Sequence, residues 1–283
     1  MMIYINLYKK YDGEFALKLC KLIFIHKLIY AFMKVRENNM NKLELLYSGK
    51  AKEVYKTDDE KYCIFEYRDD ATAFNGEKKG SFEGKGTINN VMANVIFKLL
   101  EKEGVKTHFV KQINDRETLV RKVDIIPLEV IVRNTAAGSF SKRYGVDEGT
   151  ALKEPTVEFS YKNDDLGDPL INSYHAVALN IASRDEINEI VNMAFKVNDA
   201  LKSIFIKMGI KLIDFKIEVG KTSDGEIILA DEISPDTCRL WDAKTNKKLD
   251  KDRFRFDLGE FSDVYFEVLN RLKESYPEVF KED

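Results

Sequence analysis

Residues 212–242, LIDFKIEVGKTSDGEIILADEISPDTCRLWD, constrain the fold more than any other part of this sequence. Apolar and charged residues alternate at the start of the stretch, as in a strand with one buried face. The apolar positions of that alternation are Ile213, Phe215, Ile217 and Val219. Asp224-Gly225 predicts a two-residue turn, because both central residues of such a turn need positive φ. The stretch therefore predicts a β-hairpin that carries carboxylates beside its apolar face.

Counting outward from this turn places Glu218 directly opposite Asp231. Directly paired side chains have Cβ atoms only about 5 Å apart, so two carboxylates there repel unless a cation separates them. An oxygen-only pair suits Mg²⁺, which takes one or two protein carboxylates together with phosphate oxygens and waters. Two alternatives stay open: one acid could pair with Lys216, or a different register could keep the two acids apart. Structural ion pairs imitate metal sites in this way.

The composition excludes several classes of protein. A net charge of −3 over 283 residues argues against nucleic-acid binding as the main function, although a local basic groove stays open. The three cysteines, Cys20, Cys63 and Cys238, form no CxxC pair and no cluster with histidine. Neither a disulfide framework nor a zinc site is indicated, so a reducing cytoplasm is the expected location.

Residues 1–39 differ from the rest of the chain. Residues 17–35 are strongly apolar but are interrupted by lysines and a histidine, whereas a membrane-spanning helix needs about 20 mostly uncharged residues. A secretory signal is not indicated either, because the segment has an acidic lead-in and no small-residue cleavage site. A basic amphipathic surface helix is one interpretation. The favoured one is that the functional chain starts at Met40.

Residues 40–123 are predicted to form a first lobe with a mostly antiparallel sheet and one long helix. Strands are expected on both sides of a tight turn at Gly49. A helix capped by Thr87 is expected to end at Gly104, after a long polar loop over 68–85. The expected strands are 43–55 with its turn, 61–67, 107–113, 117–122 and 128–132. Residues 124–127 are expected to cross into a second lobe, 124–283.

The second lobe contains two predicted helices and two loops of unusual composition. Ser183 and Glu186 form a capping box before a helix that ends at Gly209. A last helix begins near residue 262 and stops before Pro277. Residues 133–145 are small residues flanked by arginines, and residues 161–169 form an acidic, turn-rich loop. The fold class is therefore α+β.

Several polar residues outside the hairpin are candidates for binding anions. In residues 48–52, SGKAK, a glycine turn with two lysines can approach a phosphate, although it lacks the Walker pattern and such turns are common on surfaces. Arg133 and Arg239 can grip a phosphate or carboxylate with both guanidinium nitrogens, whereas Arg143 is interpreted as a surface arginine. Asp236 follows the hairpin and falls near the predicted metal. His175 is interpreted as a structural residue, and no nucleophilic triad is visible.

These pieces occur in the order and spacing of one family. SGKAKEVY, VIVRNTAAGS, YKNDDLGDP, DFKIEVG, DEISPDTCRLWD and DKDRFR resemble the motifs of the SAICAR synthetases, the phosphoribosylaminoimidazole-succinocarboxamide synthases of purine biosynthesis. The resemblance runs from about Leu43 to the C-terminus, and residues 1–39 fall outside it.

The resemblance implies a two-lobed, ATP-grasp-like fold with a nucleotide cleft between the lobes. It also implies an ATP-dependent ligase that joins L-aspartate to the carboxylate of carboxyaminoimidazole ribonucleotide. The products would be SAICAR, ADP and phosphate, formed in de novo purine biosynthesis through an acyl phosphate, with ATP and Mg²⁺ as cofactors. No nucleic-acid or membrane partner is expected, and a homodimer is compatible with the resemblance.

The resemblance also implies roles for individual residues. Gly49, Lys50, Ala51 and Lys52 would cover the ATP phosphates, Ile125 and Ile126 would line the adenine slot, and Glu129 would lie near the ribose. The ribonucleotide would be bound by Arg133, Ser139 and Arg239, and Mg²⁺ by Glu218 and Asp231. The implied catalytic residues are Lys52, Lys216, which would neutralise the transferring phosphate, and Asp236.

Two rival functions share parts of this inventory. A kinase-like phosphotransferase would need H-R-D and D-F-G signatures, but no H-R-D occurs and Asp214-Phe215-Lys216 breaks the second pattern. A non-catalytic nucleotide-binding protein would keep the fold and lose acids or lysines of the cleft, yet every motif acid is present. The base that deprotonates the aspartate amine is not identifiable from the sequence.

Overall fold

The computed structural model describes residue 14 and residues 18–25, 40–73 and 77–281. The chain divides into two compact units, Met1–Leu43 with Thr57–Asp59, and Glu44–Lys56 with Glu60–Asp283. In the first unit, residues 18–25 are helical. Within the described part of the chain, no helix is both long and apolar enough to cross a membrane. Much of the segment 17–35, for which an amphipathic helix was one interpretation, lies outside the described residues.

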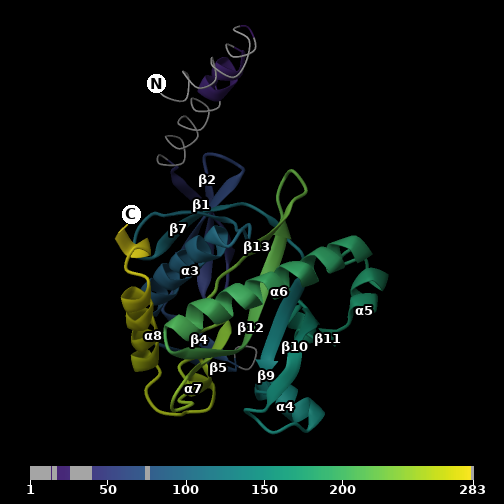
Figure 1. Ribbon diagram of the computed structural model, residues 1–283, viewed down its shortest axis with the longest axis vertical. Helices are drawn as coiled ribbons and strands as arrows, with labels where there is room; N and C mark the ends of the chain where they lie inside the picture. The colour runs from purple at the N-terminus through teal and green to yellow at the C-terminus, as the bar shows by residue number, and fades with distance from the viewer. Residues whose placement is uncertain (1–13, 15–17, 26–39, 74–76, 282–283) are drawn as a thin grey trace. The chain divides into compact units, whose positions relative to one another are not determined.

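A five-stranded sheet and one helix form the N-terminal part of the second unit (Figure 1). The strand order is β1-β2-β3-β7-β6. The bounds are β1 Lys42–Ser48, β2 Lys52–Thr57, β3 Tyr62–Tyr67, β6 Phe109–Gln112, β7 Glu117–Arg121 and α3 Lys85–Lys102. These elements confirm the strands and the long helix predicted for this region. Gly104, beyond the helix end, has a φ of 74°, as expected for a residue that terminates a helix.

The start of α3 differs from the prediction. The N-cap is Gly84, with a φ of 91°, and Thr87 lies inside the first turn. The Asp69 carboxylate accepts a hydrogen bond from the Gly86 backbone N–H at 2.8 Å. A carboxylate at a helix N-terminus is stabilising. Asp69, which is distant in sequence, therefore caps the helix in place of Thr87.

Residues 68–85 do not form one long loop. They contain a short antiparallel hairpin of β4 Asp70–Ala73 and β5 Lys78–Ser81. Ala71 and Ala73 are buried against Phe254, which also lies against Gly80. The expectation of a loop was wrong because this hairpin is stabilised by a ring far along the chain rather than by an apolar pattern of its own.

A seven-stranded sheet forms the rest of the second unit, with strand order β11-β10-β9-β12-β13 and with β8 and β14 also paired to β12. Among the described residues, the strands of this sheet pair antiparallel. The bounds are β8 Asp124–Ile125, β9 Leu128–Thr135, β10 Ala151–Tyr161, β11 Leu170–Ile171, β12 Ile210–Lys221, β13 Ile227–Ala230 and β14 Cys238–Asp242. β10 and β14 were not predicted. Residues from both sides of the predicted boundary at 123/124 share one core cluster, and the boundary itself stays a prediction.

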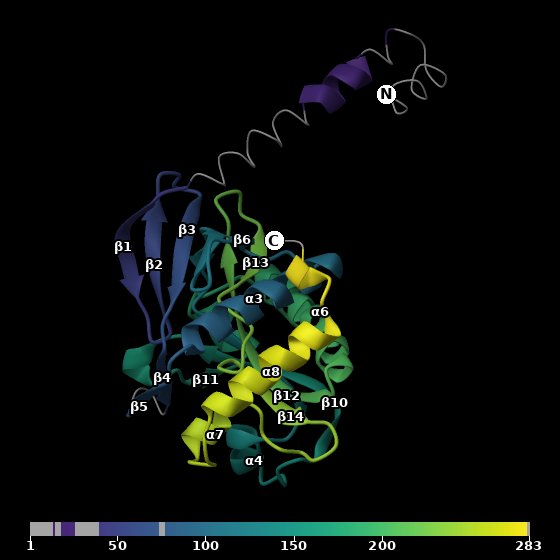
Figure 2. The same cartoon turned by 90° about the vertical axis from the view of Figure 1, so that its left-hand side faces the viewer.

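Helices cover one face of this sheet. α6, Arg184–Lys207, begins at Ser183 with the predicted capping box and packs on β12, as Figure 1 shows. α8, Ser262–Ser275, lies beside α3 (Figure 2) and confirms the predicted last helix. The shorter helices are α4 Gly138–Tyr144, η1 Asp164–Leu166, α5 Ser173–Ala178, α7 Asp252–Arg255 and η2 Val279–Lys281.

The β12–β13 hairpin exists, but its register differs by one residue from the prediction. Glu218 pairs with Ala230 rather than with Asp231. The turn has three residues, because the Thr222 N–H donates to the Glu226 carbonyl at 2.9 Å and Gly225 takes the left-handed conformation at φ 84°. A type I turn followed by a left-handed residue is the common three-residue solution. The predicted two-residue turn was therefore wrong.

The alternation along β12 largely follows the prediction. Phe215, Ile217 and Val219 are buried in the main core. Ile213 is not part of that core, because the strand is irregular between Leu212 and Asp214. It packs instead with Ala137 and Trp241 in a small separate cluster. The other face of β12 carries Asp214, Lys216 and Glu218, which line a cavity.

Candidate active site

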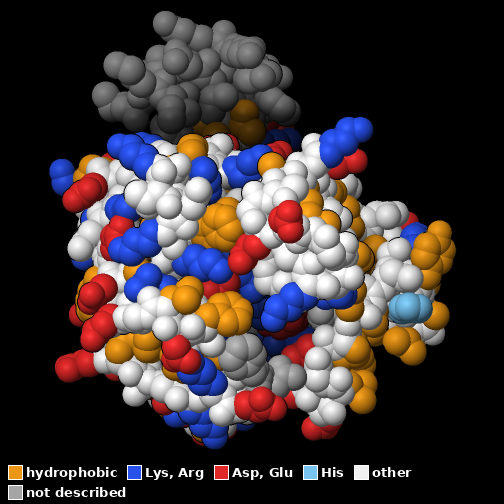
Figure 3. Space-filling view, turned by 90° about the horizontal axis from the view of Figure 1, so that it is seen from below, with side chains coloured by type: hydrophobic (Ala, Val, Ile, Leu, Met, Phe, Trp, Pro, Cys, Tyr) orange, Lys and Arg blue, Asp and Glu red, His pale blue; other side chains and the backbone are white. Residues whose placement is uncertain are grey.

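A cavity of about 690 Å³ lies over the polar face of β9 and β12. Figure 3 shows basic and acidic side chains meeting around a hollow on one face of the molecule. Of the site residues expected from the sequence, those that line the cavity are Gly49, Lys50, Ala51, Lys52, Ile125, Glu129, Arg133, Ser139, Lys216, Glu218, Asp231, Asp236 and Arg239. Residues distant in sequence are thus brought together as predicted.

Ile126 is the exception among the expected site residues. Its side chain is 3% exposed and belongs to the main core. Its backbone N–H donates to the Val219 carbonyl at 3.0 Å. Ile125, by contrast, is 39% exposed and lines the cavity. A side-chain contact of Ile126 with a ligand in the cavity is therefore not supported.

The glycine turn between β1 and β2 presents its two lysines to the cavity. The Gly49 N–H donates to the Lys52 carbonyl at 2.8 Å, which closes the turn. Lys50 donates to Asp164 at 2.7 Å. Lys52 is buried, and its ammonium lies 2.7 Å from Asp231 and 3.3 Å from Glu232. Burial alone would lower the pKa of Lys52, but these two carboxylates raise it well above its usual value. Lys52 is therefore a fixed positive charge.

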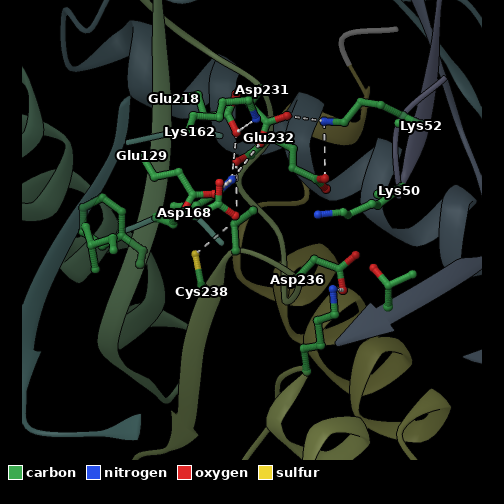
Figure 4. Close-up of a pocket in the computed structure, with 18 of the residues that line it drawn as sticks. Lys50, Lys52, Glu129, Lys162, Asp168, Glu218, Asp231, Glu232, Asp236 and Cys238 are labelled. Atoms are coloured by element: carbon green, nitrogen blue, oxygen red, sulfur yellow. Dashed lines mark hydrogen bonds and ion pairs between the residues drawn. The ribbon is translucent and has the colours of Figure 1, made fainter. Parts of the chain in front are cut away.

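Glu218 and Asp231 converge even though they are not cross-strand partners. In a regular strand, the observed register would point Asp231 to the face opposite Glu218. Asp231 instead has a φ of 64°, which ends β13 and turns the side chain back. Lys216 lies 2.8 Å from the Glu218 carboxylate and 3.9 Å from that of Asp231. Figure 4 shows the two acids side by side, with Lys52 directed at Asp231.

The charges of this cluster are held in place by one another. Lys162 donates to the Glu218 carboxylate at 2.6 Å, and Lys216 also donates to Glu129 at 3.1 Å. Burial alone would raise the pKa of the Asp231 carboxyl, but Lys52 and Lys216 outweigh it and lower that pKa. The alternative in which an acid pairs with Lys216 is thus realised for Glu218, without separating the two acids.

Asp214 lies between the two arginines that were singled out in the sequence. It pairs with Arg133 on β9 and with Arg239 on β14. Its carboxylate lies 2.7 Å from the Arg133 guanidinium and 2.9 Å from that of Arg239. Asp252 holds the other side of Arg239 at 2.8 Å. The register of three strands therefore fixes both guanidinium groups.

Arg133 and Arg239, together called the arginine row, can approach the backbone of α4 because the residues there are small. A Cβ atom at Gly138 would collide with the Arg239 guanidinium, and Gly138 has a φ of 55°. Ser139, the next residue, accepts a hydrogen bond from Arg133 at 3.3 Å. Arg143 is exposed, as expected for a surface arginine; it donates to Glu158 at 2.6 Å and does not line the cavity. The small residues noted in the sequence thus make room beside the arginines.

A second cluster of charges surrounds Asp236. Its carboxylate is contacted by Lys85, which is fully buried, by Asn89 at 2.9 Å and by the Tyr265 hydroxyl at 2.6 Å. Lys251 lies 3.8 Å from the same carboxylate. Burial alone would raise the pKa of Asp236, but Lys251 and Lys85 lower it. Figure 4 shows Asp236 apart from the Glu218 and Asp231 pair.

Several residues of the site were missed from the sequence. Lys85, Lys162, Asp214, Glu232 and Lys251 either line the cavity or hold a residue that lines it. Asp214 was considered only in the comparison with the D-F-G signature, although its place two residues before Lys216 was a usable signal. The other four missed residues do not belong to a segment in which apolar and polar residues alternate. No local pattern therefore distinguishes them from charged residues on the surface.

Two histidines have structural roles. His175 completes a capping box at the start of α5, as expected for a structural histidine. His108 was not singled out in the sequence. It is buried between the rings of Phe65 and Phe97 and contacts the backbone of Asp231. Burial, with the Lys52 charge, lowers the pKa of His108 to about 3, so the ring is neutral.

Comparison with known proteins identifies the family. A sequence model described as SAICAR synthetase matches residues 45–272. The chain belongs to the SAICAR synthetase family. It is 61% identical over 233 residues to the phosphoribosylaminoimidazole-succinocarboxamide synthase of Clostridium botulinum strain Alaska E43, which covers 82% of this chain and 99% of the relative. The enzyme of Lachnoclostridium phytofermentans is 62% identical, with the same coverage.

Solved structures agree with the sequence relatives. The phosphoribosylaminoimidazole-succinocarboxamide synthase of Ehrlichia chaffeensis superposes with a TM-score of 0.80 at 45% identity, covering 81% of this chain and 98% of the other. A SAICAR synthetase in complex with ADP gives a TM-score of 0.79 at 52% identity, covering 82% and 98%. The resemblance, the α+β ATP-grasp-like fold and the expected activity class are confirmed. The chain is an ATP-dependent ligase of purine biosynthesis.

Proposed function

We propose that this chain joins L-aspartate to the carboxylate of carboxyaminoimidazole ribonucleotide, with ATP converted to ADP and phosphate. The observation that carries the proposal is the convergence of charges in one cavity. Lys52 and Lys216 contact the acids Glu218 and Asp231, and the arginine row of Arg133 and Arg239 lines the same cavity. Such an arrangement suits the transfer of a phosphoryl group to a carboxylate, which needs positioning and positive charge.

ATP is proposed to lie over the glycine turn. Gly49, Lys50, Ala51 and Lys52 would contact its phosphates, and Ile125 and Glu129 would contact its nucleoside. These residues line one cavity, and the cations Lys50 and Lys52 there complement phosphate charge. The relative solved in complex with ADP supports nucleotide binding.

Mg²⁺ is proposed to be held by Glu218 and Asp231. The residues fit the ion: two oxygen-ligand carboxylates converge within reach of one ammonium, and the pKa of Asp231 is lowered. Among the described residues, no group of three or more acidic, histidine or cysteine side chains is placed to hold a metal. Mg²⁺ commonly takes one or two protein carboxylates together with phosphate oxygens and waters. Bound Mg²⁺ would neutralise phosphate charge.

The ribonucleotide is proposed to bind along the arginine row. Arg133 and Arg239 are held rigidly by Asp214, with Ser139 beside them, and planar guanidinium groups suit phosphate and carboxylate oxygens. Lys216, at the centre of the cavity's charges, would face the transferring phosphoryl group. Asp236 is proposed as a catalytic residue within the second cluster of charges, which includes Lys85 and Lys251.

The proposed reaction has two steps. First, a carboxylate oxygen of the ribonucleotide attacks the terminal phosphorus of ATP, and the bond to ADP breaks while Lys52 and Lys216 balance the charge. The resulting acyl phosphate then receives the aspartate amine and releases phosphate. No protein nucleophile is needed, in accord with the absence of a catalytic triad from the sequence. The proposed location is the cytoplasm, and a homodimer is compatible with the proposal.

The test is an assay of ADP release with the full-length chain. Release is expected only when carboxyaminoimidazole ribonucleotide, L-aspartate, ATP and Mg²⁺ are all present. Omission of each component in turn is the matched control, and mass spectrometry of the product identifies the amide. ADP release that continues with an alcohol acceptor and needs no aspartate would contradict the proposal and favour a phosphotransferase.

A further inference from the structure

The proposed reaction needs a base that no step above supplies. The α-amino group of an amino acid is protonated at about neutral pH and cannot attack an acyl phosphate until a proton is removed. Among the described residues that line the cavity there is no histidine. The Cys238 thiol lines it, but burial raises the pKa of that thiol. The base must therefore come from the carboxylates or the lysines.

The carboxylates of Glu218, Asp231 and Asp236 are poor candidates because cations already hold them. Asp231 is bonded to Lys52, and Glu218 to Lys162 and Lys216. Asp236 is contacted by Lys85, Asn89 and Tyr265, so donors occupy both of its oxygens. Carboxylates stabilised in this way are weak bases.

The lysines of the cavity differ in how closely they are paired. Lys50, Lys52, Lys162 and Lys216 each have a carboxylate oxygen within 2.8 Å. Lys251 has none so near, since its ion pair with Asp236 spans 3.8 Å and that acid is already bonded by Lys85. The Lys251 side chain is 14% exposed. It is the least paired of these five amines.

The surroundings of Lys251 come from several elements. Lys85 of α3 and Arg255 of α7 add positive charge, while Asp236 and Glu232, both beyond β13, add negative charge. Tyr265 of α8 donates to Asp236. Burial, with the charges of Lys85 and Arg255, outweighs the acids and lowers the pKa of Lys251. In contrast, the pKa values of Lys50, Lys52 and Lys216 are raised.

We propose that Lys251 is the general base that deprotonates the amine of the incoming amino acid, which binds in the corner lined by Asp236, Lys251 and Arg255. This proposal rests on the proposed function. Arg255 lines this corner and offers a guanidinium group to the carboxylates of aspartate. The wider separation from its nearest carboxylate distinguishes Lys251 from the four closely paired lysines of the cavity.

The step is balanced without a further reactant. The lone pair of the Lys251 Nζ accepts one proton from the substrate ammonium. The freed amine nitrogen forms a bond to the acyl carbon, and the bond from that carbon to the phosphate oxygen breaks. The electron pair leaves with the phosphate, and the remaining excess proton on nitrogen passes to it or to water.

The experiment uses the full-length chain and compares Lys251→Met and Lys251→Arg with Lys244→Met, an exposed lysine outside the cavity. With aspartate, both Lys251 variants are expected to lose about a hundredfold in kcat, the lower range for general-base catalysis. Arginine keeps the positive charge but cannot become neutral. The control is expected to stay within about twofold of the unchanged chain, and thermal unfolding confirms that all variants fold.

Hydroxylamine separates base catalysis from the earlier phosphoryl transfer, because it is largely neutral at about pH 7. The Lys251→Met chain with the ribonucleotide, ATP and hydroxylamine is expected to release ADP within about threefold of the unchanged chain. The kcat of the Lys251→Met chain with aspartate is expected to rise about tenfold per pH unit, because the fraction of aspartate with a neutral amine rises in this way. The unchanged chain should instead reach a plateau once Lys251 is neutral.

Three results would overturn the proposal. Recovery of activity in Lys251→Arg would mean that only the charge matters. An equal loss with hydroxylamine would place Lys251 in phosphoryl transfer, and a change confined to the aspartate KM would make it a binding residue. Failure of the unchanged chain to release ADP in the complete assay would instead refute the proposed function itself.

Discussion

The two faces of the β9–β12 strand pair both contain deeply buried side chains but are built from opposite chemistry. Val130, Val132 and Ile217 are fully buried in the main core. On the other face, Arg133 and Asp214 are each only 3% exposed, yet they carry full charges. An apolar face needs close packing, whereas buried charges need oppositely charged partners and hydrogen bonds in good geometry.

This difference implies that the faces tolerate change differently. The core face should respond to lost volume through stability, because its side chains contribute contacts and nothing else. The cavity face should respond through turnover or substrate affinity, because its side chains are already compensated by one another in the folded chain. The following predictions test that separation, beginning with the largest expected effect.

Glu218→Ala is expected to lower Mg²⁺-dependent ADP release by about a thousandfold, since metal neutralisation of charge contributes several kcal/mol. The fold should survive, because Lys216 keeps Asp231 and Glu129 as partners. Steady-state rates over a range of Mg²⁺ concentrations measure the loss, with the matched variant Glu226→Ala, outside the cavity, as control. Unfolding of Glu218→Ala instead would mean that the acid is a structural ion-pair partner.

Ile217→Ala, on the opposite face of the same strand, is expected to reduce the free energy of unfolding by about 2–5 kcal/mol. Ile217 is fully buried in the main core, so the substitution leaves a cavity there. Urea unfolding measures the loss, and kcat per folded molecule should stay within about threefold. A large drop in kcat without a loss of stability would show that the two faces are not separable.

Arg239→Lys is expected to raise the KM for the ribonucleotide by about ten- to a hundredfold, because a charge-assisted hydrogen bond contributes about 1.5–3 kcal/mol. The lysine keeps the charge between Asp214 and Asp252 but loses the planar fork. Lys52→Ala should instead raise the ATP KM or lower kcat. Kinetics with one substrate varied at a time distinguish these outcomes. A change in the ATP KM alone for Arg239→Lys would refute the division of the cavity.

A chain that starts at Met40 is expected to show activity and a melting temperature comparable with those of the full chain. It retains every residue of the cavity, and the family match begins at residue 45. Steady-state kinetics and thermal unfolding of both chains provide the comparison. A large drop in either quantity, or membrane association seen only with residues 1–39 present, would reverse this expectation.

The sequence by itself determined the family, the longer helices and many of the strands, and it predicted site residues that, apart from Ile126, line the cavity. Period-2 alternation along β12 and the capping box of α6 are local signals, and each depends on a few neighbouring residues. The motif order predicted Lys52, Glu218 and Arg239 as site residues, and they line one cavity. Ile126 was the exception, because a motif match does not say which of two adjacent side chains faces the core.

The tertiary structure decided what depends on distant partners. Asp69 caps α3 in place of Thr87, and Phe254 supports the β4–β5 hairpin within the expected loop. The turn at Gly225 shifted the register by one residue, and the left-handed Asp231 restored its convergence with Glu218. The pairing states of the lysines likewise follow from which strand lies beside which. Backbone propensity acts over a few residues, whereas electrostatic compensation and packing act across elements that meet only in the folded chain.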